Sequence, residues 1–223
     1  MADRLPLFPL GLVLVPGQVL PLHVFEPRYR VLVEDLLAGD AAHRELGVVA
    51  IRSGREVGED GVLALHEVGT VARLRSAERH TDGRYDLLTV GTDRFRLVGF
   101  EHDKPYLVGR VERLPDTPGD HADAELLAPA TRAALAQYVR ALAAAGSGRD
   151  ALPELPADPR SLGYLVTAAA RVDLADRQAL LEADDDAARL RAALDLLRRE
   201  TRLMHALSAV PAPELARTPL SPN

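Results

Sequence analysis

The sequence predicts an α+β protein in which a β-rich amino-terminal part is followed by a helical carboxy-terminal part. Up to Leu114, short apolar or alternating runs are separated by turn residues, a pattern typical of strands. After a linker at 115–122, apolar residues recur with the 3.6-residue period of helices. We therefore expect a β-rich subdomain over 1–114 and a helical bundle over 123–208. A proline-bearing tail over 209–223 is expected to be disordered.

The first thirty residues predict a β–β–α opening. Two apolar runs are separated at the turn Pro16-Gly17, and a third run ends at Glu26-Pro27. Because proline lacks a backbone donor, it must lie at a strand start, a strand edge or a turn, and it suits the first position of a helix. We expect that helix near residues 28–37.

The chain from there to Leu114 predicts a meander of short strands. The run 46–51 is continuously apolar, as in a buried strand, and Asp82-Gly83 predicts a hairpin turn before a strand over 85–90. Separate strands are expected over 94–98 and 106–111. So many short strands favour a closed or nearly closed sheet, because closure removes exposed edges.

Four helices are expected in the second part. An alanine- and leucine-rich helix over 124–145 stops at a Gly-Ser-Gly sequence, and another follows over about 160–171. Asp173 is suited to cap the third helix, and the acidic run 184–186 suits the start of the last one. The last helix carries a stripe that needs a packing partner, formed by Leu190, Leu194, Leu197, Thr201 and Met204.

Composition excludes several functional classes. The 223 residues include no cysteine, so disulfides and thiolate chemistry are absent, and a reducing cytoplasm is the expected location. No apolar run approaches the roughly 20 residues that span a bilayer. A net charge of −6 and an aromatic content of 4% oppose nucleic-acid binding.

Motifs for catalysis are missing. The chain has no phosphate-binding loop and no Gly-x-Ser-x-Gly elbow, and the residues after His66-Glu67 do not complete a zinc-protease pattern. The seven histidines are scattered, and none is paired at i, i+4. We therefore expect no catalytic residue, no cofactor and no metal site.

Two sets of residues are candidates for binding. Phe25, Tyr29 and Tyr106 could anchor a polypeptide, although a structural role, holding the helix against the sheet, is favoured for the same aromatics. A second set could form a basic patch for nucleic acid, or a solvated sheet face balanced by nearby acidic residues. These arginines are Arg73, Arg75, Arg94 and Arg96.

The sequence resembles the amino-terminal substrate-binding domain of Lon proteases, which also occurs as a free-standing protein. The resemblance is carried by Leu5-Pro6-Leu7-Phe8-Pro9-Leu10, by Phe25-Glu26-Pro27-Arg28-Tyr29 and by further matches in order over about residues 5 to 205. It implies a PUA-like pseudo-barrel followed by a helical bundle. It also implies recognition of unfolded polypeptides, without the ATPase and Ser–Lys peptidase domains of Lon.

The leading functional hypothesis is therefore a non-enzymatic module that binds unfolded or partly unfolded polypeptides, with a separate protease as a further partner. RNA binding through the arginine face is the alternative. A small-molecule sensor ranks last, because the zinc-bearing sequence of such sensors has no counterpart in a chain without cysteine. The sequence leaves the oligomeric state open.

Overall fold

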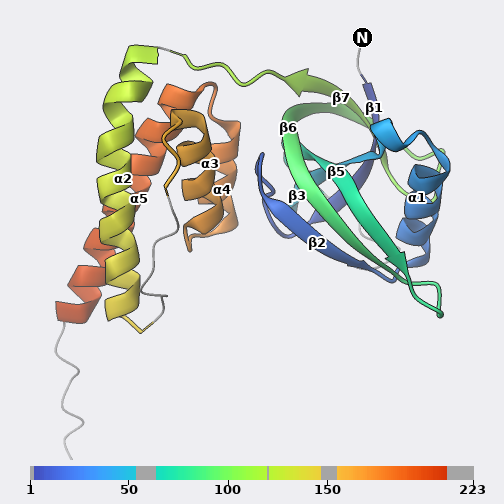
Figure 1. The fold of residues 1–223 in the computed structure, drawn as a ribbon, viewed down its shortest axis with the longest axis horizontal. Coiled ribbons are helices and arrows are strands. Elements are labelled where there is room, and N and C mark those ends of the chain that lie inside the picture. Colours follow the sequence, from blue (N-terminus) through green and yellow to red (C-terminus); the bar gives the residue numbers. More distant parts are fainter. Residues whose placement is uncertain (1–2, 54–63, 120, 147–154, 210–223) are drawn as a thin grey trace, which may run out of the picture.

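The chain folds into a seven-stranded mixed sheet followed by a group of helices, in a computed structural model that describes residues 3–53, 64–119, 121–146 and 155–209 (Figure 1). This confirms the predicted α+β class. The strands are β1 (Asp3–Leu10), β2 (Val19–Val24), β3 (Glu45–Ser53), β4 (Ala64–Leu65), β5 (Val68–Arg79), β6 (Tyr85–Glu101) and β7 (Val108–Leu114). The helices are α1 (Pro27–Ala38), the short 3-10 helix η1 (Ala41–His43), α2 (His121–Ala144), α3 (Pro159–Ala169), α4 (Leu174–Glu182) and α5 (Asp186–Ala209).

The sheet closes on itself. Its strands run in the order β1-β7-β6-β5-β3, and β3 pairs back onto β1. Most neighbours are antiparallel, but β1 and β3 are parallel, with Leu7 opposite Gly47 and Leu10 opposite Ala50. The β1 strand therefore uses its first half to pair with β7 and its second half to pair with β3. This arrangement agrees with the predicted closed or nearly closed sheet.

The inside of the barrel is filled by apolar side chains around Phe95, which is fully buried with Leu5, Leu7, Val49 and Val111. Gly69 on β5 makes room for this ring, because a Cβ at that position would lie 2.4 Å from the Phe95 ring. A second cluster lies where α1 covers the barrel.

The strand β6 differs from the prediction. Residues 85–90 and 94–98 were expected to form separate strands, but β6 is continuous over 17 residues. Gly91 lies within it because a Cβ there would come within 2.3 Å of the carbonyl oxygen of Val15. The glycine therefore marks a close approach of two backbones rather than the end of a strand.

The helices match their predicted positions within a few residues. Asp173 caps α4 by accepting a hydrogen bond from the Asp176 N–H, as expected. The apolar stripe of α5 packs against α2 and α3, which lie beside it (Figure 1). No helix in the described ranges is long and apolar enough to cross a membrane.

The boundaries of the two subdomains stay predictions. The α2 helix begins at His121, inside the expected linker, and α5 ends at Ala209. The rest of the expected disordered tail, 210–223, lies outside the described residues.

Candidate functional site

Phe25 and Tyr29 lie where the chain passes from β2 into α1. Pro27 occupies the first turn of the helix, as the sequence predicted. Phe25 comes directly after the last residue of β2 and is 49% exposed, whereas Tyr29 is only 5% exposed. The Tyr29 ring stacks on Phe8 at 4.2 Å between centroids, and the Arg28 guanidinium lies 4.7 Å from its centroid. Tyr29 thus holds the helix to the barrel, while Phe25 faces solvent.

A small cavity opens beside Phe25. It has a volume of about 210 Å³ and its walls are mostly apolar. Phe25 and Tyr29 both line it, together with Phe8, Leu10 and Leu22. The structure therefore brings two of the three predicted aromatic contacts to one cavity, at the edge of the barrel.

The outer face of β2 carries further exposed apolar side chains. Side chains alternate along β2, so that Val19 and Pro21 point outward, and Phe25 continues this alternation. Leu88 of β6 lies opposite Pro21 in the ladder and is exposed on the same face. We call Val19, Pro21, Phe25 and Leu88 the β2 surface. The exposed pair of His23 and Asp86 lies on the same face, between Pro21 and Phe25.

One edge of β2 is open. Within the residues that the structure describes, β2 pairs with β6 alone, so its second edge has no strand partner. Such an edge presents backbone N–H and C=O groups that another extended segment can pair with. An apolar face and an unpaired edge thus meet at the same strand.

Tyr106 lies elsewhere. Its side chain is 6% exposed in the core beneath α1, and its hydroxyl donates a hydrogen bond of 2.6 Å to the Asp35 carboxylate. Burial and this carboxylate raise the pKa of Tyr106 well above its usual range. The contact in turn lowers the pKa of Asp35, helped by Lys104. Tyr106 therefore positions α1 and is not accessible to a ligand.

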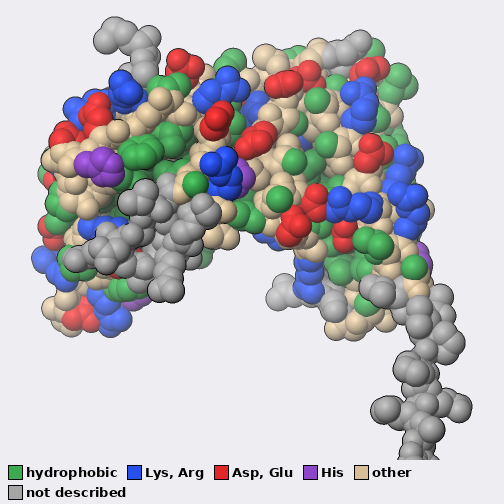
Figure 2. All heavy atoms as spheres, turned by 180° about the vertical axis from the view of Figure 1, so that it is seen from behind, with side chains coloured by type: hydrophobic (Ala, Val, Ile, Leu, Met, Phe, Trp, Pro, Cys, Tyr) green, Lys and Arg blue, Asp and Glu red, His purple; other side chains and the backbone are tan. Residues whose placement is uncertain are grey.

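The four arginines of the predicted basic patch do not share one surface. Arg73, Arg75 and Arg96 are exposed, and Arg73 pairs with Glu45 at 2.7 Å. The prediction is wrong for Arg94, which is only 3% exposed and is covered by the helical part. The face shown in Figure 2 has cationic and anionic side chains interspersed over both parts of the molecule.

Arg94 belongs to a buried polar network that joins the barrel to the helices. Its Nε donates to Asp116 at 2.9 Å, and its Nη1 donates to the carbonyl oxygens of Leu181 and Ala183 at 2.8 and 2.7 Å. Asp116 lies in the predicted linker, where it also accepts a 2.7 Å hydrogen bond from the Tyr164 hydroxyl. The linker is therefore fixed to both parts.

Two further arginines complete this network. Arg189 is fully buried, pairs with Asp186 at 2.8 Å and lies 4.2 Å from the centroid of the Tyr164 ring. Burial lowers the pKa of Arg189 and raises that of Tyr164. Arg160 pairs with the same Asp186 at 3.0 Å.

A larger cavity of about 700 Å³ lies next to the network, between the Val15–Gln18 turn and α3. Its walls mix apolar residues such as Leu165 with charged ones such as Asp93 and Arg160. A cavity with this mixed, partly charged lining suits an apolar polypeptide segment less well than the β2 surface does.

Comparison with protein families identifies the family of this chain. Residues 4–199 match the family model described as the ATP-dependent protease La (LON) substrate-binding domain. The chain belongs to the Lon substrate-binding domain family. This confirms the resemblance found in the sequence, and the match covers nearly all of the described strands and helices.

Relatives of this Lon domain include two whole proteases. The chain is 30% identical to Lon protease 2 of Myxococcus xanthus over 90% of its own length, and 31% identical to Lon protease 2 of Sorangium cellulosum over 91%. It spans only 24% and 25% of those two proteins, about a quarter of their length.

Solved structures show the same fold. A Lon N-terminal domain protein from Xanthomonas campestris is 26% identical, with a TM-score of 0.56 over 86% of this chain and 98% of that one. The N-terminal domain of Mycobacterium avium complex Lon protease has a TM-score of 0.63 at 17% identity, over 88% of this chain and 98% of that one.

Sequence reasoning missed part of this Lon domain's surface. The exposure of Val19 and Leu88 depends on which strand lies beside β2, and no local pattern reports that pairing. The role of Asp116 was hidden for the same reason, because its partners come from β6, α3 and α5.

Proposed function

We propose that this Lon domain is a non-enzymatic module that binds extended, apolar segments of unfolded or partly unfolded polypeptides at the β2 surface. The observation that carries the proposal is the meeting of a half-exposed Phe25, an apolar cavity and an open strand edge. The family description, a substrate-binding domain of a protease, supports a polypeptide as the ligand.

The binding mode follows from the geometry of an edge strand. An extended segment that pairs with the free edge of β2 satisfies its backbone groups without regard to sequence. Alternate side chains of such a segment point to the same face as Val19 and Phe25. Folded proteins keep their apolar segments and strand edges covered, so they should bind weakly.

The non-enzymatic role and a cooperating protease belong to the same proposal. The matched region corresponds to the substrate-binding part of the family rather than to its peptidase part. A module that holds a segment extended would deliver it to a separate protease in a cleavable conformation. The cytoplasmic location stays a prediction from composition.

The nucleic-acid alternative would have to work without Arg94. That side chain is engaged in the junction between barrel and helices, so a charge reversal there tests folding rather than RNA binding. A valid test of the alternative is the salt dependence of RNA affinity in a variant with Arg75→Glu and Arg96→Glu, both of which are exposed.

The proposal is tested by fluorescence anisotropy with one labelled model protein in two forms, native and permanently unfolded by reduction and carboxymethylation. We expect binding to the unfolded form and little to the native one. Phe25→Ala should weaken that binding by about tenfold to thirtyfold, since an aromatic anchor contributes roughly 1.4–2 kcal/mol.

Phe100→Ala is the matched control, because Phe100 is 44% exposed at the other end of β6 and should leave affinity unchanged. Equal affinity for native and unfolded forms would refute polypeptide selectivity. Equal losses in the two phenylalanine variants would refute the β2 surface as the site.

A further inference from the structure

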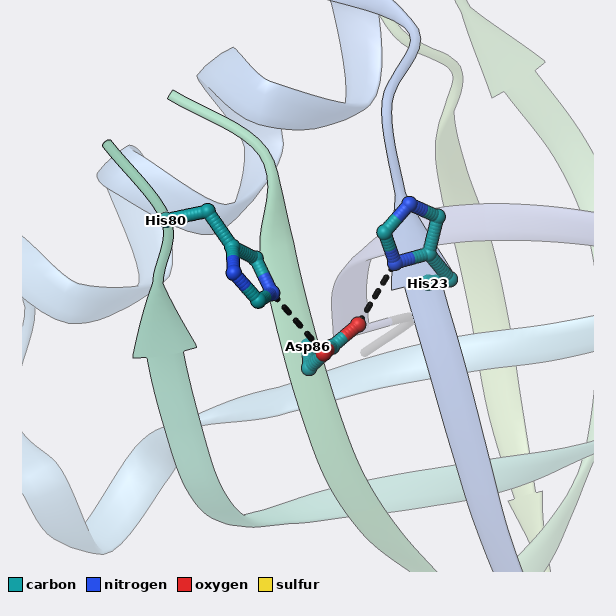
Figure 3. A group of neighbouring side chains, drawn as sticks. All are labelled: His23, His80 and Asp86. Carbon is teal, nitrogen blue, oxygen red and sulfur yellow. Dashed lines mark hydrogen bonds and ion pairs between the residues drawn. The ribbon is translucent and has the colours of Figure 1, made fainter. Parts of the chain in front are cut away.

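Three side chains that are far apart in the sequence meet on the outside of the barrel. His23 extends from β2, Asp86 from β6, and His80 from the residue after β5 (Figure 3). The His23 Nδ1 lies 2.6 Å from one Asp86 carboxylate oxygen, and the His80 Nε2 lies 2.8 Å from the other. The potential donor atoms of all three residues lie within 4.8 Å of one another.

The backbone holds these residues in place. His23 and Asp86 are direct partners in the antiparallel ladder of β2 and β6. His80 is fixed by the β5–β6 hairpin, in which its N–H donates to the Arg84 carbonyl at 2.8 Å and its carbonyl accepts from the Gly83 N–H at 3.0 Å. Gly83 has a φ of 83°, which the turn requires and which glycine adopts without strain. The cluster is therefore set by main-chain hydrogen bonds on both sides.

We propose that His23, His80 and Asp86 form a binding site for a divalent transition-metal ion, with Zn²⁺ as the expected ion. Two imidazole nitrogens and a carboxylate oxygen are a common set of three protein ligands for Zn²⁺, with water in the fourth position. The side chains are between 36% and 52% exposed, so an ion can enter from solvent and keep that water. Mg²⁺ and Ca²⁺ prefer sets made of oxygen atoms, and two imidazoles therefore select against them.

The nitrogens that face Asp86 are the ones that would bind the ion. The Asp86 carboxylate offers one oxygen to each ring, at 2.6 Å from the His23 Nδ1 and at 2.8 Å from the His80 Nε2. Small rotations of the two rings about their side-chain bonds replace each nitrogen–oxygen contact with a shared contact to the ion.

One neighbouring cation must turn away when an ion binds. The Arg84 Nη1 lies 3.4 Å from the His23 Nε2, and this nitrogen carries the ring proton when Nδ1 binds a metal, so two donors would then face each other. Arg84 already contacts Asp82 through its Nε at 2.7 Å, so its guanidinium can turn to that partner. His23 lies between Pro21 and Phe25 on the outer face of β2, with its ring 6.3 Å from the Phe25 ring, but the metal proposal does not rest on polypeptide binding.

The test uses the full chain without a histidine tag, stripped with a chelator and titrated with Co²⁺ and with Zn²⁺. We expect the visible absorption bands of tetrahedral Co²⁺, displaced by Zn²⁺, and a calorimetric titration that saturates at one Zn²⁺ per chain. His80→Ala should weaken Zn²⁺ binding by about tenfold or more, since even loss of an outer-shell partner costs metal sites about 10- to 100-fold. Asp86→Asn should do the same.

The matched control is His43→Ala, because His43 is exposed and, among the described residues, forms an ion pair with Asp40 alone, at 3.1 Å. It should leave the titration unchanged. Circular dichroism of each variant checks that the hairpin stays folded. Absence of Co²⁺ bands and of Zn²⁺ heat in the wild type would overturn the proposal. Unchanged affinity in folded His80→Ala would overturn it as well, and so would equal binding of Mg²⁺.

Discussion

Replacing Arg94 with methionine removes the guanidinium at the junction and keeps most of the apolar stem. The side chain is 3% exposed and donates to Asp116 and to two carbonyl oxygens, those of Leu181 and Ala183. Loss of one partner of a buried ion pair costs about 3–5 kcal/mol, because the remaining charge stays buried.

The structure places the expected loss near the lower end of that range. Asp116 keeps the hydrogen bond from the Tyr164 hydroxyl, and Arg189 lies 4.0 Å away. Asp116 is also 15% exposed, so water can solvate part of its charge. We therefore expect Arg94→Met to lower the free energy of unfolding by about 3 kcal/mol.

The assay is urea unfolding followed by circular dichroism, with Arg96→Met as the matched control. Arg96 is two residues along the same strand and exposed, so its variant should stay within about 0.5 kcal/mol of the wild type. In Arg94→Met with Asp116→Asn, part of the loss should be recovered, because no unpaired charge remains. Equal effects of the two single methionine variants would refute the reasoning.

Two further predictions concern the barrel. Burial opposes ionisation of Glu45, but hydrogen bonds from Arg113 and Arg73 outweigh it and hold its pKa below its usual value of 4.5. Because the pKa is lowered in the folded state, the ionised Glu45 stabilises the fold above pH 4.5, and this stabilisation is lost as the pH falls through the folded-state pKa. Glu45→Gln should therefore lower the free energy of unfolding by about 1–3 kcal/mol at pH 7 and by much less at pH 3, measured by urea unfolding. A constant difference across that range would contradict this. Gly91→Ala forces a methyl group to 2.3 Å from a backbone oxygen and should cost about 1–3 kcal/mol in the same assay, whereas Gly39→Ala, whose nearest atom lies at 3.6 Å, should be neutral.

Local signals predicted the elements of the fold well. Pro27 begins α1, Gly83 forms the hairpin turn and Asp173 caps α4, each as its residue type requires. Each of these signals acts within a few residues of its own position, which is why the sequence alone contains it. The family resemblance then supplied the overall arrangement, because it links many such positions in order.

Long-range contacts were out of reach of the same reasoning. Arg94 lies in an alternating strand, and this pattern predicts an arginine that faces solvent. It is buried instead, because it contacts residues that lie 22 to 89 positions away in the sequence. His23, His80 and Asp86 have no metal-ligand spacing in the sequence, because three separate segments bring them together. Phe25 and Tyr29 are four positions apart, and only the packing of α1 decides that one is exposed and the other buried.

The double pairing of β1 has a consequence for how the chain folds. Its first half pairs with β7, where Asp3 lies opposite Val111, and its second half pairs with β3. The ring therefore cannot close until more than a hundred residues of chain are available, and such distant pairing slows folding. Until β1 and β7 pair, the first half of β1 and one edge of β7 stay unpaired, so this closure is also the step that ends the period in which a newly made barrel is exposed to aggregation.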